Sequence, residues 1–376
     1  FSQDEINAVS SVLESGNVNY WTGAECGKFE SEFADFCNSN HAIALMNGTV
    51  ALDLALKAIK ISPGDEVIVT SRTFFSSVSS IVNLGAIPIF ADVLMDSQNI
   101  DPESIYKKTK AIICVHLAGW PCEMDSIMEL AVMHELFVIE DCAQAHGAKY
   151  KGKPVGSIGH IGSWSFCQDK IMTTGGEGGM VTTNDEVFWR RMWEYKDHGK
   201  SYKATFKSGQ PSGYRWLHES FGSNYRMTEM QAAIGRIQLK KMNSWHAKRS
   251  VNANKIWTVA KKYKGLYVPE VPNYIDHAAY KCYVFLKLSQ LKEDWNRDRI
   301  IEKINSLGVP CYFGSCSELY LEKAFDDTNF RPIERLPVAK ELGETSMMFL
   351  VHPTLTIDEI QQTCDAISIV IKLASK

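Results

Sequence analysis

Short apolar runs alternate with helical patterns over residues 38–185 of the chain. The apolar runs are nearly continuous, whereas the segments between them repeat their apolar residues every three or four positions. We expect strands at 65–71, 87–93, 110–119 and 136–142, and helices at 49–59, 76–85 and 124–135. Strands that are apolar on both faces belong to a covered sheet, which is usually parallel. The pattern therefore predicts an α/β fold with a mostly parallel central sheet flanked by helices.

The second half of the chain predicts longer helices and a further strand. A helical pattern runs through residues 227–260, and we expect a strand at 280–288 and helices at 298–308 and 356–374. An amphipathic helix is also expected within residues 1–16. These pieces are typical of a smaller α+β unit beside the first one.

We expect two domains of unequal size, because 376 residues exceed what a single small core needs. The large domain is predicted over residues 1–240 and the small α+β domain over residues 241–376. The long helical pattern would connect them. Residues 200–213, which are rich in Gly, Ser and Lys, are expected to form a mobile loop.

Charge and composition narrow the classes of function. With 40 basic and 44 acidic residues, the formal charge of −4 favours neither nucleic acid nor an anionic membrane surface as a partner. No apolar run reaches transmembrane length, and the N-terminal segment lacks the basic and apolar regions of a signal peptide. The ten cysteines show no metal-ligand spacing. We therefore expect a cytoplasmic protein with reduced thiols and no metal site.

A carboxylate closes the last of the four expected strands. Ligands of open α/β sheets bind at the carboxyl ends of strands, where Asp141, His116 and residues 72–75 fall. Asp141 follows apolar residues and is expected to be partly buried, and buried aspartates are rare unless paired. It either caps the turn that follows, with Gln144 completing a capping box, or it pairs with the ring nitrogen of pyridoxal phosphate. In the second case Gln144 would bond the phenolic oxygen of the ring.

A single lysine, Lys170, lies between a strand-like segment at 162–166 and a glycine-rich loop. A lysine in a turn is ordinarily solvated and inert. In a site that removes water from it, its amine loses a proton more readily, attacks an aldehyde and shuttles a proton in the resulting imine. The loop around Glu177 lacks the spacing of a Walker or dinucleotide-binding loop. A lysine that forms an imine and an aspartate that pairs with a ring nitrogen are what pyridoxal phosphate requires.

Further residues would hold the phosphate and the ring of such a cofactor. Gly48 and Thr49 open a helix, so that free backbone N–H groups and a hydroxyl meet at its N-terminus, a geometry that binds phosphate. Ser165 would add a second hydroxyl. Phe74 either stacks on the pyridine face or belongs to the core.

Five motifs occur together along the chain: HAIALMNGTVAL, DEVIVTSRTF, IEDCAQAHGA, SFCQDKIMTTGGEGG and NYRMTEMQAAIGRIQL. In this order and at this spacing, the chain resembles the DegT/DnrJ/EryC1/StrS family of sugar aminotransferases. The similarity extends from Tyr20 to the last expected helix. It implies a fold-type I pyridoxal phosphate enzyme, like aspartate aminotransferase, which works as a homodimer with active sites shared between the subunits.

The resemblance also implies cofactor roles for individual residues. Lys170 would be the Schiff-base lysine, and Asp141 the partner of the pyridine nitrogen. Gln144 would hold the ring oxygen, and Phe74 would stack on the ring. The phosphate would be bound by Gly48, Thr49 and Ser165.

Other positions of the resemblance concern the partner subunit and the sugar. Asn224 would reach the cofactor phosphate from the partner subunit, whereas Arg226 and His198 match positions near the sugar. From the residues alone, Asn224 and His198 are isolated polar residues for which a solvated or structural role is the default. Arg72 stands where many relatives have an aromatic residue, and this cation would meet a phosphate or carboxylate near the site.

Because the lysine is present, the resemblance implies transamination. Glutamate would load the amine, leaving pyridoxamine phosphate and 2-oxoglutarate, and the amine would pass to a ketosugar, most often a nucleotide-linked 4-keto-6-deoxyhexose. The amino sugar would serve a surface polysaccharide, such as the O-antigen of a lipopolysaccharide, or a related glycoconjugate. Alternatives are a 3-ketosugar as substrate, a sugar dehydratase or deoxygenase of the same fold, and a non-catalytic regulatory protein that binds pyridoxal phosphate. Relatives that dehydrate or deoxygenate have a histidine in place of the lysine.

Overall fold

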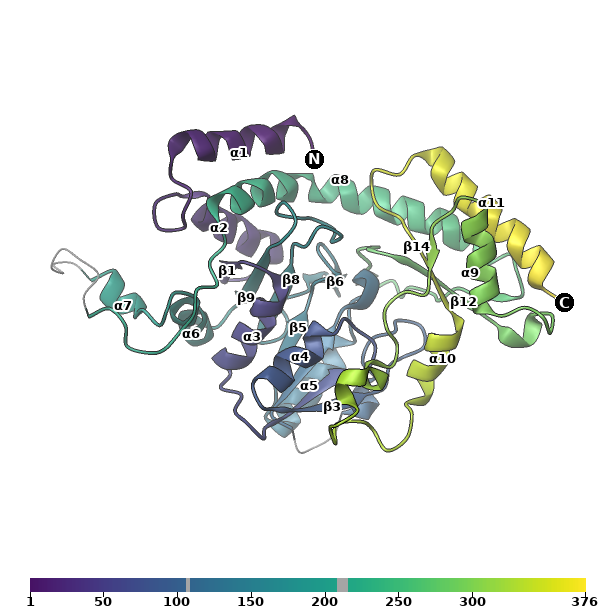
Figure 1. Cartoon of the computed structure of the whole chain (residues 1–376), viewed down its shortest axis with the longest axis horizontal. Helices are drawn as coiled ribbons and strands as arrows, with labels where there is room; N and C mark the ends of the chain where they lie inside the picture. The colour runs from purple at the N-terminus through teal and green to yellow at the C-terminus, as the bar shows by residue number, and fades with distance from the viewer. Residues whose placement is uncertain (106–108, 208–215) are drawn as a thin grey trace.

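Seven strands form the central sheet of the computed structural model, which describes residues 1–105, 109–207 and 216–376 (Figure 1). The strand order is β1-β9-β8-β5-β4-β2-β3. The strands are β1 (His41–Leu45), β2 (Glu66–Thr70), β3 (Ile87–Ala91), β4 (Ala111–Val115), β5 (Phe137–Asp141), β8 (Ile161–Ser165) and β9 (Gly179–Thr183). Neighbouring strands from β3 to β8 are parallel, and β9 is antiparallel to both of its neighbours. The prediction of a mostly parallel sheet is confirmed.

Helices cover both faces of this sheet, which explains its continuous apolar strands. Successive residues of a strand point to opposite faces, so Val69 joins the core beneath α3 and α4, whereas Ile68 joins the core beneath α5. The helices of the large domain are α1 (Gln3–Ser15), α2 (Glu25–Cys37), α3 (Gly48–Ala58), α4 (Ser76–Asn83), α5 (Met124–His134) and α6 (Glu186–Lys196). The helices expected at 49–59, 76–85 and 124–135 correspond to α3, α4 and α5.

A 32-residue helix, α8 (Glu229–Ala260), runs along one edge of the molecule from the large domain to the small one (Figure 1). It begins with a capping box between Thr228 and Gln231. The small domain has an antiparallel sheet in the order β10-β12-β14-β13, whose core is shared with α9, α11 and the last turns of α8. Its elements are β10 (Leu266–Tyr267), β12 (Cys282–Leu286), β13 (Cys311–Tyr312), β14 (Ser346–Phe349), α9 (Arg297–Ser306), α10 (Pro337–Thr345) and α11 (Ile357–Ala374).

Two segments that follow residue 240 return to the large domain. Strand β11 (Ile275–Asp276) pairs with β6 (Lys149–Tyr150), which in turn pairs with β7 (Lys153–Pro154). Leu319, Tyr320 and Phe325 are buried in the core of the large sheet. Residue 240 itself lies inside α8. The two domains therefore contact each other through several segments of the chain. Residues of both domains line the cavity between them.

The segment expected to be a mobile loop contains a short helix, α7 (Tyr202–Thr205), which begins at the Ser201 cap. The part of that loop at 208–213 lies outside the described residues. All ten cysteines are free thiols, and eight of them are buried. Among the described residues, no helix is long and apolar enough to cross a membrane.

Candidate active site

Two adjoining cavities lie at the carboxyl ends of the parallel strands. The first, of about 460 Å³, is bordered by the ends of β4, β5 and β8 and by the start of α3. The second, of about 410 Å³, has walls from both domains. Seven of the residues expected at the cofactor line the first cavity: Gly48, Thr49, Phe74, Asp141, Gln144, Ser165 and Lys170.

Asp141 ends β5 with a buried carboxylate. Its Oδ2 accepts a hydrogen bond of 2.8 Å from the Ser77 hydroxyl, and its Oδ1 accepts one of 3.1 Å from the Ala143 N–H. The Ser77 hydroxyl is itself 3.0 Å from that of Thr73. Burial raises the pKa of the Asp141 carboxyl, and the bonds from Ser77 and Ala143 oppose this rise. Turns and not a helix follow Asp141, and the bond from the Ala143 N–H to Oδ1 caps the first of them, so Asp141 caps this turn with one oxygen while its carboxylate also faces the cavity.

Gln144 offers its amide nitrogen to the first cavity. Its Oε1 accepts a hydrogen bond of 2.8 Å from the Ala118 N–H, and this bond occupies the acceptor side of the amide. The Nε2 group is then left as the donor for an acceptor in the cavity. A donor at this position suits the phenolic oxygen of a pyridoxal ring. The capping-box interpretation of Gln144 is wrong, because its side chain bonds Ala118 and not the backbone of Asp141.

A helix N-terminus and a hydroxyl form the opposite end of the first cavity. Helix α3 begins at Gly48 after the Asn47 cap, whose side chain accepts the Val50 N–H, so the first backbone N–H groups have no acceptor within the helix. A Cβ at position 48 would lie 2.6 Å from the Ser165 Cβ. Only glycine therefore lets α3 approach β8 this closely. The result is a set of donors that fits a phosphate.

Lys170 lies between these two ends, with 15 % of its side chain exposed. Its Nζ is 3.8 Å from Asp169 Oδ1 and 5.6 Å from the centroid of the Tyr280 ring. The Tyr280 hydroxyl donates a 2.7 Å hydrogen bond to Asp169 Oδ2. Burial raises the pKa of Asp169, but Lys170, Tyr280 and Lys281 outweigh it and hold that pKa below its ordinary value. The amine thus faces the first cavity from a polar and partly enclosed position.

Phe74 and Arg72 differ in where they point. Phe74 lines both cavities with 68 % of its surface exposed, so it is free to stack on a bound ring and is not part of the core. Arg72 is buried, and its guanidinium bonds Gln98 at 2.9 Å and Ser346 at 3.1 Å. It lines neither cavity. Its side chain connects the large domain to β14, and its Nη1 has no hydrogen-bond partner among the described residues. A contact of Arg72 with a substrate anion stays a prediction.

Asn224, Arg226 and His198 also lie outside the two cavities of their own chain. Asn224 forms an isolated antiparallel bridge with Asp197, and Arg226 makes a 2.8 Å ion pair with the same aspartate. His198 is exposed, with a backbone φ of 61°. The structure therefore does not bring these residues together with Lys170 within one chain.

Three buried residues near Asp141 in sequence or space could form a metal site, but hydrogen bonds within the protein already occupy the side chains of His116 and Glu140. His116 Nδ1 accepts the Cys122 N–H, so its Nε2 donates to Glu140 at 3.0 Å. The Glu140 carboxylate accepts three further bonds, from the N–H groups of Gly156, Ile158 and Gly159. Cys142 completes the only group of possible metal ligands among the described residues. These bonds give the group a structural role at the end of β5.

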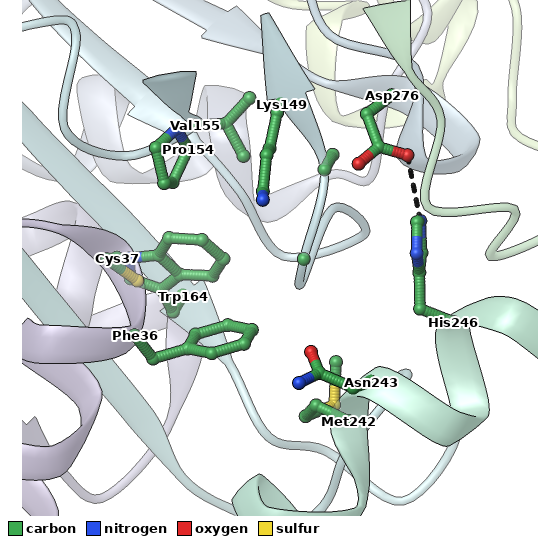
Figure 2. A pocket seen from close by; sticks show the side chains of 12 residues that line it. Phe36, Cys37, Lys149, Pro154, Val155, Trp164, Met242, Asn243, His246 and Asp276 are labelled. Atoms are coloured by element: carbon green, nitrogen blue, oxygen red, sulfur yellow. Dashed lines mark ion pairs between the residues drawn. The ribbon is translucent and has the colours of Figure 1, made fainter. Parts of the chain in front are cut away.

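A third cavity, of about 190 Å³, lies away from these residues (Figure 2). Phe36, Trp164 and Met242 form apolar walls, and the ion pair of His246 with Asp276, 3.4 Å long, stands at one side. None of the residues expected to bind the cofactor lines it. The chemistry therefore belongs to the cavities around Lys170.

The residues present fit pyridoxal phosphate. The first cavity offers phosphate donors at Gly48, Thr49 and Ser165, a carboxylate for the ring nitrogen at Asp141, and an amine at Lys170. The glycine at position 48 keeps open a space that a Cβ would fill. Sequence reasoning missed Ser77 and Tyr280, since nothing in their spacing links them to Asp141 or Lys170, and it placed Thr73 at a strand end within 72–75 without giving it a role. This fold and this donor set define a fold-type I enzyme that uses pyridoxal phosphate.

Comparisons with known proteins agree with this class. The profile of the DegT/DnrJ/EryC1/StrS aminotransferase family matches residues 1–368, and the chain belongs to this family. A GDP-perosamine synthase of Escherichia coli O157:H7 is 36% identical, over 91% of this chain and 88% of that protein. A dTDP-3-amino-3,6-dideoxy-alpha-D-galactopyranose transaminase of Aneurinibacillus thermoaerophilus is 32% identical, over 97% of this chain and 95% of that protein. The X-ray structure of an aminotransferase from Psychrobacter cryohalolentis is 62% identical, with a TM-score of 0.97 over 99% of this chain and 98% of that one.

Replacing Gly48 with alanine is expected to weaken cofactor binding by roughly ten- to a hundredfold, because the new Cβ would push α3 away from Ser165. The measurement is a titration of cofactor-free protein with pyridoxal phosphate, followed by absorbance. Gly27→Ala is the matched control, since a Cβ at this position in α2 meets no atom within 4 Å. Unchanged affinity in Gly48→Ala would show that the phosphate is not bound at this helix terminus.

Proposed function

We propose that this aminotransferase moves an amino group from glutamate to a ketosugar carried on a nucleotide, with a 4-keto-6-deoxyhexose as the preferred acceptor. The observation that carries the proposal is Lys170 at the junction of the two cavities, between the Asp141 carboxylate and the phosphate donors of α3. The second cavity leaves room for a substrate beside the cofactor. Relatives that are named for GDP- and dTDP-linked amino sugars support the class of substrate.

The chemistry that the cofactor supplies is electron withdrawal from the donor's Cα, together with temporary storage of the amino group. Asp141 would hold the proton on the ring nitrogen, because Ser77 and Ala143 fix its carboxylate at the cavity wall. Lys170 Nζ takes the proton from Cα of the donor and returns one to the sugar carbon during transfer. Gln144 would donate to the ring oxygen, and Phe74 would cover the ring face.

The test is a pair of half-reactions on the purified enzyme. Glutamate is expected to convert the bound cofactor to its amine form and to release 2-oxoglutarate, and a panel of GDP-, dTDP- and UDP-linked ketosugars is then screened for return to the aldehyde form. An acceptor that regains the aldehyde form and gains an amine supports the proposal. Loss of water from a ketosugar without any 2-oxoglutarate would indicate a dehydratase instead, and cofactor binding with neither reaction would indicate a regulatory protein.

We propose that the enzyme works in the cytoplasm. Its product would be an amino sugar for a surface polysaccharide or related glycoconjugate. Free thiols at all ten cysteines suit a reducing compartment. The working form is proposed to be a homodimer in which Asn224 reaches the cofactor phosphate of the partner subunit. This placement accounts for the position of Asn224 outside the cavities of its own chain.

Mixing Lys170→Ala with Asn224→Ala subunits is expected to restore about a quarter of wild-type activity, since half of the randomly paired dimers would contain one intact site. Activity is measured after subunit exchange has been verified with differently tagged chains. Each variant on its own serves as the control and should be nearly inactive. If exchange is complete and activity does not return, the sites are not shared between subunits.

A further inference from the structure

Lys281 of the small domain contributes a cation to the wall of the second cavity. It directly precedes β12, and its side chain is half-buried. Its Nζ lies 4.7 Å from the centroid of the Tyr280 ring, and Lys170 Nζ lies 5.6 Å from the same centroid. The two amines therefore share one aromatic neighbour. Lys281 makes no ion pair among the described residues. The Asp169 carboxylate acts on it through its charge, but that carboxylate already accepts a hydrogen bond from Tyr280 and pairs with Lys170.

An unpaired ammonium in this position is unusual. Lysines normally extend into water, and taking one partly out of water without a partner costs free energy. Burial lowers the pKa of Lys281, the charge of Asp169 opposes this, and the positive charges of Arg249 and Lys170 add to the lowering. A lysine that is partly buried in a cavity, although burial disfavours its charge, is typical of a group that binds a substrate anion.

The segment that carries Lys281 is fixed to the end of the large sheet. The Tyr280 N–H donates to the Ala118 oxygen at 2.9 Å, and the Ala278 N–H donates to the Gly119 oxygen at 2.9 Å. Ala118 also donates its N–H to Gln144 in the cofactor cavity. The position of Lys281 relative to the cofactor site is thus set by backbone contacts and does not depend on a flexible loop.

The chemistry of the reaction requires a cation at this place. One reactive amine serves both half-reactions, so the donor and the acceptor occupy the same space in turn, and an amino-acid donor brings carboxylates beside Lys170. Among the described residues that line the two cavities, the cationic side chains are Lys170 and Lys281. Lys170 is committed to the cofactor and to proton transfer. Within a single chain, Lys281 remains to neutralise the carboxylate.

We propose that Lys281 binds a carboxylate of the amino donor during loading of the enzyme. This inference rests on the proposed function, since it takes glutamate as the donor. The ammonium forms a charge-assisted hydrogen bond to the carboxylate in the second cavity and orients the donor so that its amine meets the reactive carbon beside Lys170. The same group selects an acidic donor over a neutral amine.

The experiment compares Lys281→Met, Lys281→Arg and Lys287→Met as holoenzymes. Lys287 directly follows β12 and also lies over a tyrosine ring, that of Tyr267, but it is exposed and lines neither cavity, which makes it a matched control. The rate of amine loading is followed against glutamate concentration. Binding of glutarate, which has two carboxylates and neither an amine nor a ketone, is measured by calorimetry. The ketosugar half-reaction is recorded in parallel.

In Lys281→Met, the half-saturating glutamate concentration and the glutarate dissociation constant are expected to rise about 10- to 100-fold, with the limiting rate nearly unchanged. Lys281→Arg and Lys287→Met should remain within roughly threefold of wild type. Wild-type values in Lys281→Met, an equal loss in Lys287→Met, or a loss confined to the ketosugar half-reaction would each overturn the inference. A wild-type enzyme that does not react with glutamate contradicts the proposed donor, and the glutarate titration then decides separately whether Lys281 binds carboxylates.

Discussion

Replacing Lys170 with alanine is expected to lower the rate of amino transfer by about four orders of magnitude while the fold remains intact. The substitution removes both the nucleophile for the cofactor and the group that moves the proton, and proton transfer alone contributes up to about 10⁴-fold. The side chain is 15 % exposed and makes one distant ion pair, with Asp169 at 3.8 Å, and because the Asp169 side chain is 60 % exposed, water solvates that carboxylate when the lysine is lost. Turnover with glutamate and a ketosugar is the measurement, with near-UV circular dichroism as the check on folding.

The covalent role of Lys170 has its own measurement. Borohydride reduction of the wild-type holoenzyme followed by peptide mapping should label the peptide that contains Lys170, and the absorbance band of the lysine-bound cofactor near the visible edge should be missing in Lys170→Ala. Lys153→Ala, an exposed lysine in β7, is the control and should keep both the band and the activity. Label on another lysine, or turnover in Lys170→Ala close to wild type, would contradict the assignment.

The sequence was sufficient for those parts of the fold that follow from local periodicity. The strand expected at 136–142 is β5 (Phe137–Asp141), and the helix expected at 356–374 is α11 (Ile357–Ala374). Continuous apolar strands also indicated a sheet covered on both faces. The antiparallel placement of β9 between β1 and β8 and the pairing of β11 with β6 were not predicted, because partners far apart in sequence leave no periodic signal in either segment.

The residues of the candidate site also divide into those that local sequence predicted and those that it did not. Asp141 and Lys170 stand next to a strand end and a glycine loop, so their neighbours in sequence already indicate their surroundings. Tyr280 donates a hydrogen bond to Asp169, which lies 111 residues earlier in the sequence. No sequence pattern predicts a contact between residues so far apart. For Arg72, the sequence predicted the position in the fold but not the direction of the side chain. Its position at the end of a strand was predicted, but its side chain points to Gln98 and Ser346, a choice that depends on how the small domain packs.

The domain contacts explain why the two sides of the site differ in predictability. The cofactor side is built from consecutive β-α-β units, so residues at the ends of β5 and β8 meet because the sheet is parallel. The substrate side also needs Tyr280, Lys281 and Met348, whose placement follows from the return of the chain across the cleft after α8. Substrate choice is therefore expected to vary through residues of the small domain while the cofactor residues stay the same.

Replacing Asp141 with alanine is expected to lower turnover by about 10²- to 10³-fold while the affinity for pyridoxal phosphate falls less than roughly tenfold. The difference arises because the donors at Gly48 and Ser165 still hold the phosphate, whereas the ring loses the buried negative charge that keeps its nitrogen protonated. Turnover and cofactor dissociation constants are measured on the same preparations, so the two effects are separated directly.

Two further variants distinguish the charge of Asp141 from its hydrogen bonds. Asp141→Asn keeps an acceptor oxygen but no charge, and it should lose nearly as much turnover as Asp141→Ala if the charge holds the ring proton. Ser77→Ala removes the 2.8 Å bond to Oδ2 and should cost less than about tenfold, because the carboxyl group itself remains and is still held by the Ala143 N–H. Near-normal turnover in Asp141→Ala would remove this residue from the ring nitrogen. An Asn variant as active as wild type would instead mean that an acceptor oxygen is sufficient there and that the ring nitrogen needs no negative partner.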